Sequence, residues 1–166
     1  DEVEFSIKGV SEGRKKKAAG DRRVWWRGGF KPGTLTAVPR ETGKTIAVRE
    51  IKTAGPPARI QLSADTAVLS SNTTELSFIT AQLTDKEGNP VPGSDQLLTF
   101  SISGGARLAG TDNGLQTDLT PCGSPHRKTW KGLCLAVVKA GRTGQTITVT
   151  ATAAGLPPAS IELTIR

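Results

Sequence analysis

Short stretches in which apolar and polar residues alternate follow one another along the chain. Val3, Phe5 and Ile7 alternate with polar residues, and Ile147 and Val149 alternate with threonines. A period of two places successive side chains on opposite faces of a strand, whereas a helix would repeat its apolar residues every three or four positions. No helical stripe of useful length accompanies these stretches, and the sequence therefore predicts an all-β fold.

The predicted strands fall into two groups on either side of a stiff connector. The connector, 53–57, ends in Gly-Pro-Pro, and proline restricts itself and its predecessor to extended conformations. The predicted strands are 2–8, 22–27, 33–38 and 44–52 before it, and 58–62, 76–84, 97–103, 133–139, 145–153 and 159–165 after it. Several short strands separated by turns, such as the one predicted over 85–92, are typical of an antiparallel β-sandwich.

This pattern predicts two immunoglobulin-like antiparallel β-sandwich modules in tandem. We expect a partial module over 1–55, a Pro-rich hinge at 56–58 and a C-terminal module over 59–166. The first module has about four strands where such a sandwich needs about seven, so we expect it to be truncated at its N-terminus. The chain has no methionine and opens directly in strand-like alternation, which indicates a piece of a longer protein.

Two details of the second module are less regular. The strand 76–84 carries Leu76, Phe78, Ala81 and Leu83, which need a bulge or a change of face to lie on one side. The stretch 104–132 is expected to be a long loop, and loops of that length tend to be functional or specially braced.

Positive charge gathers in the first third of the chain. Residues 1–57 hold 13 Lys and Arg against 7 Asp and Glu, whereas residues 58–166 hold 9 against 8. Basic residues beside tryptophans, as in 22–27, occur on nucleic-acid surfaces. The cluster is short and lacks a recognition motif, so we favour a solvated hairpin tip and a strand with a basic face. We expect no nucleic-acid partner. No window approaches the roughly 20 apolar residues of a membrane span, and no membrane contact is expected.

Residues 111–132 concentrate chemically versatile side chains. Cys122, His126 and Cys134 offer three zinc ligands, but their spacing matches no known zinc motif and a fourth ligand is missing. Ser124 and His126 lie two residues apart with no motif that would position an oxyanion hole. We therefore expect no metal, no cofactor and no nucleophilic catalysis in this stretch.

The two cysteines leave two interpretations open. A disulfide between Cys122 and Cys134 would suit an exported protein. Alternatively Cys134, which alternates with the apolar Leu133 and Leu135 that we expect to point inward, is a plain buried thiol. The sequence leaves the compartment open, with a periplasmic or secreted parent protein favoured.

The same stretch has two further interpretations, a sugar platform and a braced loop. In the first, Trp130 stacks on a pyranose while Asp112, Asn113 and Arg127 bind hydroxyl groups. In the second, which we favour, Trp130 caps the core, Asp112 bonds the backbone of an Asn-Gly turn, and Arg127 pairs with Asp112 or Asp118 to lock the loop. These four residues, Asp112, Asn113, Arg127 and Trp130, are the candidates for a sugar-binding or interdomain contact.

A resemblance to a known family covers essentially the whole chain in order. The matching segments are 1–5, 8–15, 26, 30–35, 53–55, 110–114, 117–119, 124–125 and 132–138. They resemble the opening Asn-Gly hairpin, the W-x-V-x-Y-x-P-G-x-L segment, the closing TAG and the next C-terminal domain of β-galactosidases of glycoside hydrolase family 2. Lys8, Gly28 and Cys122 depart from that pattern, at positions where the family has Asn, Val and an aromatic residue.

The resemblance implies a non-catalytic accessory segment of such a galactosidase. In this family two glutamates on a central barrel carry out retaining hydrolysis, and that barrel would lie upstream of this segment. A retaining pair needs carboxyl groups about 5–5.5 Å apart, and no such pair is readable from the spacing of the glutamates here. The expected partners are the catalytic domains of the parent enzyme, with galactose-containing glycans and a homo-oligomer as further partners. A carbohydrate-binding module and a bacterial surface or adhesion domain are the alternatives.

Overall fold

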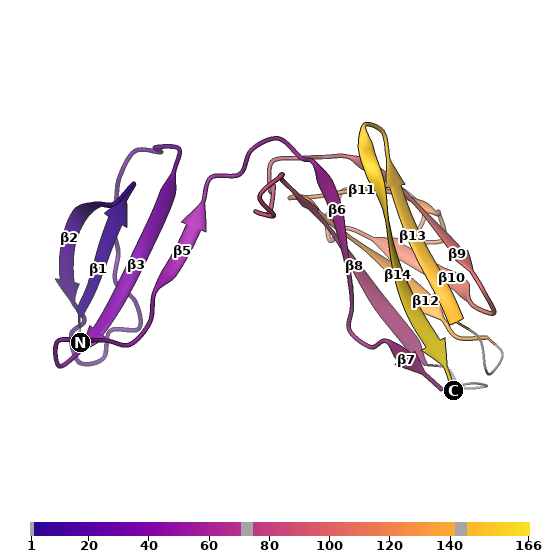
Figure 1. Ribbon diagram of the computed structural model, residues 1–166, viewed down its shortest axis with the longest axis horizontal. Coiled ribbons are helices and arrows are strands. Elements are labelled where there is room, and N and C mark those ends of the chain that lie inside the picture. The colour runs from indigo at the N-terminus through magenta and orange to yellow at the C-terminus, as the bar shows by residue number, and fades with distance from the viewer. Residues whose placement is uncertain (1, 71–74, 142–145) are drawn as a thin grey trace. The chain divides into compact units, whose positions relative to one another are not determined.

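The computed structural model describes residues 2–70, 75–141 and 146–166 (Figure 1). Every regular element in these residues is a β-strand, which confirms the all-β prediction. The described residues contain no helix with the length and apolarity that crossing a bilayer requires. The chain divides into two compact units, Asp1–Thr53 and Ala54–Arg166. We call them the first and the second unit and describe each by itself.

The first unit is a single five-stranded antiparallel sheet with the order β2-β1-β3-β4, in which β5 also pairs with β3. Its strands are β1 (Glu2–Ile7), β2 (Val10–Lys16), β3 (Thr34–Glu41), β4 (Lys44–Thr45) and β5 (Arg49–Lys52). The sequence predicted β1 and β3. It predicted one strand over 44–52 where the structure has two, and it missed β2, which is exposed along its whole length.

A two-residue turn of Lys8 and Gly9 joins β1 to β2. Ile7 pairs with Val10 across it, and both turn residues have positive φ, 51° at Lys8 and 78° at Gly9. Positive φ at both central residues is the geometry that suits the right-handed twist of paired strands, and it is why Asn-Gly is preferred there. Lysine thus occupies a conformation that asparagine adopts more readily.

The two faces of this sheet differ in chemistry. On one face Val3, Phe5 and Ile7 of β1 lie opposite Pro39, Ala37 and Leu35 of β3. The other face carries an ionic cluster, in which the Glu4 carboxylate accepts a 2.6 Å hydrogen bond from Arg40 and lies 3.3 Å from Arg14. The hydrogen bonds from Arg40 and Ser11 hold the pKa of Glu4 below its usual value.

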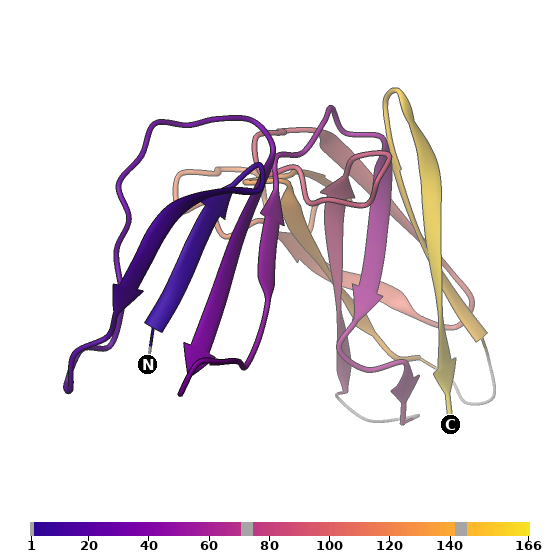
Figure 2. The ribbon, with the colours of Figure 1, turned by 60° about the vertical axis from the view of Figure 1, so that its left-hand side comes forward.

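The predicted strand 22–27 is wrong. The backbone from Asp21 to Lys31 pairs with no strand, and it runs along the sheet as a long connection between β2 and β3 (Figure 2). Two contacts tie this segment to the sheet: the Trp26 ring lies 5.4 Å from the Phe5 ring, and the Lys15 ammonium donates a 2.5 Å hydrogen bond to the Trp25 carbonyl. The segment therefore covers part of the sheet face instead of extending its edge.

The second unit is a β-sandwich of two sheets with the orders β10-β12-β8-β6 and β11-β9-β13-β14-β7. Its strands are β6 (Arg59–Ala64), β7 (Val68–Leu69), β8 (Leu76–Thr84), β9 (Leu97–Ser103), β10 (Arg107–Asp112), β11 (His126–Lys128), β12 (Leu133–Lys139), β13 (Thr146–Ala153) and β14 (Leu156–Ile165). All pairs are antiparallel except β14 with β7. The core lies between the sheets and includes Ile79, Leu83, Leu98, Ile147 and Leu163, each at most 1% exposed.

The predicted strands 76–84, 97–103 and 133–139 coincide with β8, β9 and β12, but the assignment of faces in β12 is wrong. In β8, Ile79, Ala81 and Leu83 fill the core with no bulge, while Phe78 is 42% exposed. In β12 it is Cys134 that points inward, and Leu133 faces outward. In β12 the larger Leu133 and Leu135 were expected to point inward, whereas the period of two gives the core to Cys134, Ala136 and Val138.

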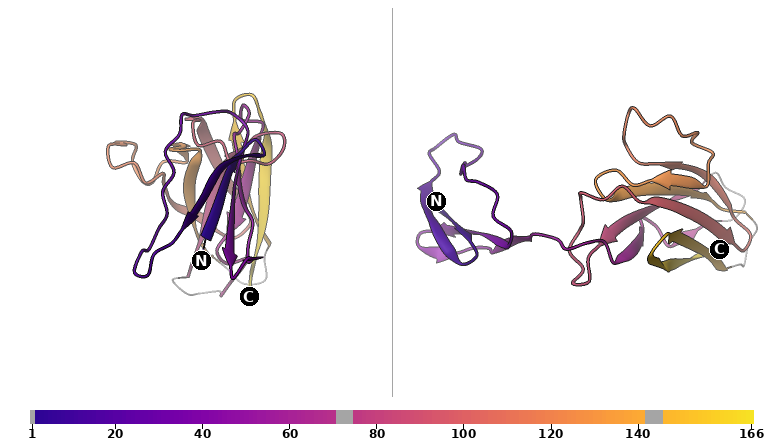
Figure 3. Two further views of the ribbon diagram at one scale, coloured as in Figure 1. Left: turned by 90° about the vertical axis from the view of Figure 1, so that its left-hand side faces the viewer. Right: turned by 90° about the horizontal axis from the view of Figure 1, so that it is seen from above.

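The stretch 104–132 is not one loop, because it contains β10 and β11. The longest part outside these two strands is the segment 113–125 between them, which we call the β10–β11 loop. Figure 3 shows it extending away from the two sheets. Thr111 belongs to β10 and is buried, and its hydroxyl donates to the Ser124 carbonyl at 2.8 Å, so the far end of the loop is tied to β10.

Candidate functional site

Asp112 closes a tight turn at the start of the β10–β11 loop. Its Oδ1 accepts hydrogen bonds from the backbone N–H groups of Asn113 at 2.5 Å and Gly114 at 2.7 Å. Aspartate readily forms this local turn, and Gly114 supplies the positive φ of 74° that follows it. Asp112 thus braces the loop, as the sequence suggested, although its side chain is at the surface.

Arg127 of β11 is the centre of the loop's hydrogen bonding. It is 2% exposed, and its Nε and Nη2 donate to the hydroxyl of Thr111 at 3.2 Å and to the carbonyl of Thr111 at 2.9 Å. Its other donors reach the Asp118 carboxylate at 2.9 Å and the carbonyls of Thr120 and Pro121, both at 3.0 Å. A guanidinium group has five N–H donors, and all five are used, two on Thr111 of β10 and three on residues of the loop.

Asp118 is the acidic partner of that arginine, one of the two partners expected from the sequence. Hydrogen bonds from the side chain and backbone of Thr120, together with Arg127, hold the pKa of Asp118 far below its usual value. Asn113 binds the same carboxylate at 2.8 Å and the Lys128 carbonyl at 3.0 Å, and its own carbonyl accepts from Leu115 at 2.9 Å. Asn113 and Arg127 therefore use their polar groups to hold the loop to itself and to the flanking strands β10 and β11.

Trp130 lies between the loop and β12 and is partly buried. The Lys131 ammonium lies over its ring at 4.6 Å, and the ring lies beside Gly114, where a Cβ would be 3.9 Å away. Trp130 also pairs with Leu133 in a short antiparallel bridge. A sugar could stack on this face of the ring only if the lysine side chain moved aside.

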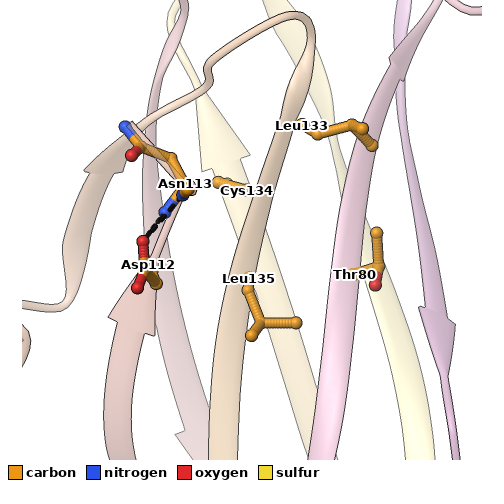
Figure 4. A pocket seen from close by; sticks show the side chains of 7 residues that line it. Thr80, Asp112, Asn113, Leu133, Cys134 and Leu135 are labelled. Atoms are coloured by element: carbon orange, nitrogen blue, oxygen red, sulfur yellow. Dashed lines mark hydrogen bonds between the residues drawn. The ribbon is translucent and has the colours of Figure 1, made fainter. Parts of the chain in front are cut away.

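A pocket of about 320 Å³ lies beside the Asp112 turn, on the outward face of β12 (Figure 4). It is lined by Thr80, Asp112, Asn113, Gly114, Leu133, Cys134 and Leu135. Asp112 is the sole acidic residue in this lining, and its Oδ2 accepts none of the hydrogen bonds found among the described residues. Since retaining hydrolysis needs two carboxyl groups, the pocket can bind a polar group but lacks that catalytic pair.

Cys122, His126 and Cys134, which the sequence did not favour as zinc ligands, form no metal-binding group in the part of the chain that the structure describes, where no group of three or more His, Cys, Asp and Glu is placed to hold a metal ion. Both cysteines are free, Cys122 exposed and Cys134 buried. Burial raises the pKa of the Cys134 thiol to about 12. His126 Nδ1 lies 2.9 Å from the Thr99 hydroxyl. The plain buried thiol is therefore the interpretation of Cys134 that the structure supports.

Sequence reasoning grouped Asp112, Asn113, Arg127 and Trp130 as one candidate site. The structure brings Asp112 and Asn113 to the pocket and places Trp130 beside Gly114, whereas Arg127 lies buried under the loop. Thr111 and Thr120 were missed, although both hold the loop. The sequence hardly marks these two threonines as functional, because threonine is also frequent in strands of this chain that have no such role.

The second unit is a β-sandwich domain, and the polar residues of its β10–β11 loop mainly stabilise the loop itself. Residues 60–162 match the family described as glycoside hydrolase family 2 C-terminal domain 5, and residues 1–47 match a domain of unknown function, DUF4982. The chain belongs to the family of glycoside hydrolase family 2 C-terminal domains.

Relatives agree with this assignment. The chain is 38% identical over 164 residues to Beta-galactosidase BoGH2A of Bacteroides ovatus, covering 98% of this chain and 19% of that protein. It is similar to a family 2 glycosyl hydrolase of Bacteroides cellulosilyticus, with a TM-score of 0.91, 32% identity and coverage of 98% and 23% of the two chains. It is also similar to a β-glycosidase of Bacteroides vulgatus, with a TM-score of 0.90 and 29% sequence identity. That match covers 99% of this chain and 21% of the other. The chain spans about a fifth of the length of these relatives.

Proposed function

We propose that this chain is a non-catalytic part of a family 2 β-galactosidase that supports the catalytic barrel, access to the active site or contacts between subunits. The observation that carries the proposal is the 38% identity to Beta-galactosidase BoGH2A across 98% of the chain. A catalytic barrel takes about 250 residues, more than this chain has, and the pocket described above holds one carboxylate where retaining hydrolysis needs two. The partners are then the catalytic domains of the parent enzyme.

The test compares two proteins in one assay of aryl β-galactoside hydrolysis. The full-length enzyme is expected to turn the substrate over, and the purified 166-residue chain is expected to leave it intact. Turnover that follows this chain through every purification step would contradict the non-catalytic role. A full-length enzyme that leaves the aryl β-galactoside intact but cleaves another glycoside would contradict the assignment as a galactosidase. It would not contradict the non-catalytic role of this chain.

A second function, binding of galactose-containing glycans, is favoured by the pocket next to Trp130. The unengaged Oδ2 of Asp112 could accept a sugar hydroxyl there, and the Lys131 side chain is flexible enough to uncover the Trp130 ring. Galacto-oligosaccharides would then change the fluorescence of Trp130 in a saturable way, and Trp130→Phe would remove that change. An unchanged fluorescence up to millimolar sugar argues against this second function.

A further inference from the structure

Leu119 is 94% exposed at the β10–β11 loop. It is the most exposed large apolar side chain among the described residues, well beyond Leu97 at 51% and Val68 at 45% in the same unit. A single exposed leucine on a surface is ordinary. The surroundings of Leu119 make this one unusual.

The loop that carries Leu119 is held in one conformation from both sides. Its neighbour Asp118 is bound by Arg127, Asn113 and the Thr120 amide, and the Thr120 carbonyl accepts from Arg127. An isolated flexible loop would lose conformational freedom on binding, and a preorganised one loses much less. Leu119 is therefore displayed on a loop whose backbone needs little further ordering on binding.

The segment that carries Leu119, residues 113–125, is close to neutral. Asp118 is the one charged residue between Asn113 and Pro125, and its charge is compensated by the buried Arg127. Depletion of charge around an apolar anchor is the composition found at the centres of protein–protein interfaces.

We propose that Leu119 anchors the β10–β11 loop in an apolar socket on the catalytic domain of its own polypeptide. This inference rests on the proposed function, because it names that domain as the partner. A protein partner fits better than a glycan, since residues 113–125 contain no aromatic ring that could stack on a sugar.

The small size of the loop favours a partner in the same polypeptide over a second copy. A stable interface between separate proteins uses about 20–30 residues a side, roughly twice what residues 113–125 provide. Covalent attachment raises the effective concentration of a partner to the millimolar range for a short linker. A small apolar contact is sufficient under that condition.

Cys122 provides a direct readout, because it is exposed and belongs to the same loop, whereas Cys134 is buried. The experiment measures the rate at which a maleimide modifies Cys122, by mass spectrometry of its peptide, in the 166-residue chain and in the full-length enzyme. We expect at least a tenfold slower reaction in the full-length enzyme. Equal rates in the two proteins would overturn the proposal.

Two full-length variants separate docking from general destabilisation. Leu119→Asp is expected to restore the fast modification of Cys122 seen in the free chain, and Leu97→Asp, at another exposed leucine of the same unit, is expected to leave it slow. A photo-crosslinking residue at Thr117, which is exposed, should react with the catalytic domain. Crosslinks confined to a second copy, or protection of Cys122 that grows with enzyme concentration, would overturn the intrachain docking.

Hydrolysis of aryl galactosides is measured on the same samples, so that the two proposals fail separately. Hydrolysis with an unprotected Cys122 overturns the docking of Leu119 and leaves the proposed function standing. Protection that Leu119→Asp abolishes, in an enzyme that cleaves no galactoside, supports the docking and removes the assignment as a galactosidase.

Discussion

Arg127 stabilises the second unit through a hydrogen-bonding pattern that lysine cannot reproduce. Arg127→Lys keeps the charge, but a lysine ammonium lacks the guanidinium fork that reaches the carbonyls of Thr111, Thr120 and Pro121 together. We expect the free energy of unfolding to fall by about 3 kcal/mol, measured by urea denaturation. Lys128→Gln, at an exposed neighbour on β11, is the control and should change stability little. Equal stability of the two variants would show that the loop does not depend on Arg127.

Asp112 acts on the loop at short range. Asp112→Ala removes the acceptor of the Asn113 and Gly114 amides, and we expect a cost of about 1 kcal/mol and faster hydrogen exchange at these two amides. Thr117→Ala, at an exposed position of the same loop, serves as the control. If Asp112→Ala instead leaves exchange unchanged and weakens binding of galacto-oligosaccharides, the residue belongs to a sugar site and not to a brace.

The ionised form of Asp118 is favoured by folding, and this fixes the direction of a pH effect. Because the pKa of Asp118 is lower in the folded chain than in the unfolded chain, its contribution to stability is present above about pH 4, the usual aspartate value. That contribution is lost as the pH falls further, towards the folded pKa. As the pH is lowered from 6 to 2.5, the melting temperature of the unsubstituted 166-residue chain should therefore fall more steeply than that of Asp118→Asn. Parallel curves would contradict this.

At the scale of the element, the turn between Trp130 and Leu133 depends on a glycine. Gly132 has a φ of 75°, and a Cβ there would overlap the Val91 carbonyl oxygen, while its own carbonyl accepts from Leu83 at 2.8 Å. We expect Gly132→Ala to cost about 3 kcal/mol, from the strained backbone and the forced shift together. Gly88→Ala is the matched control, because Gly88 has a φ of 87° and open space around it. Similar losses in both variants would show that the Val91 carbonyl yields easily.

Alternation along the strand was sufficient to predict most of the second unit, because each of its core strands has one face against the other sheet. It failed where neighbouring residues on both faces are apolar. In β12 the sequence LCLAVV offers two equivalent faces, and only the packing of the sheets gives the inward one to Cys134, Ala136 and Val138. β2 escaped prediction for the opposite reason, since its side chains are all exposed and mostly charged.

Only part of the hydrogen bonding in the β10–β11 loop could be predicted from the sequence. The Asp112-Asn113-Gly114 turn is local, and the pairing of Arg127 with an aspartate follows from charge. The carbonyls that take up the remaining donors of Arg127 carry no signal in the sequence, because every residue has one. For that reason a buried arginine that serves the backbone was indistinguishable from an arginine that serves a ligand.

At the scale of the whole molecule, the two units differ in how much apolar surface they bury. Ile7 is the one buried core residue of the first unit among those described, and Val10, Ile46, Val48 and Ile51 are each more than half exposed. The Trp26 indole N–H is buried and has no acceptor among the described residues. The expectation that further strands complete this unit stays a prediction.

We therefore expect the second unit to fold alone and the first unit to need more chain. Residues 54–166 expressed by themselves should melt cooperatively, with a melting temperature close to that of the main transition of the full chain. Residues 1–53 should give no cooperative transition, and an N-terminal extension taken from the full-length protein should restore one. A cooperative melt of residues 1–53 alone would show that one sheet and the segment containing Trp26 suffice.

The position of β14 determines when the second unit can complete its fold during synthesis. β14 lies between β13 and β7, and its residue Thr164 pairs in parallel with Val68 near the start of the unit. Leu163 and Ile165, both 1% exposed, complete the core. The ribosome synthesises residues 156–165 after all the other strands of the second unit. β7 therefore has no strand to pair with until the residues between β7 and β14 have been translated. A nascent chain halted before Leu156 therefore displays an open sheet edge and an unfilled interior, the features that chaperones bind and proteases cleave.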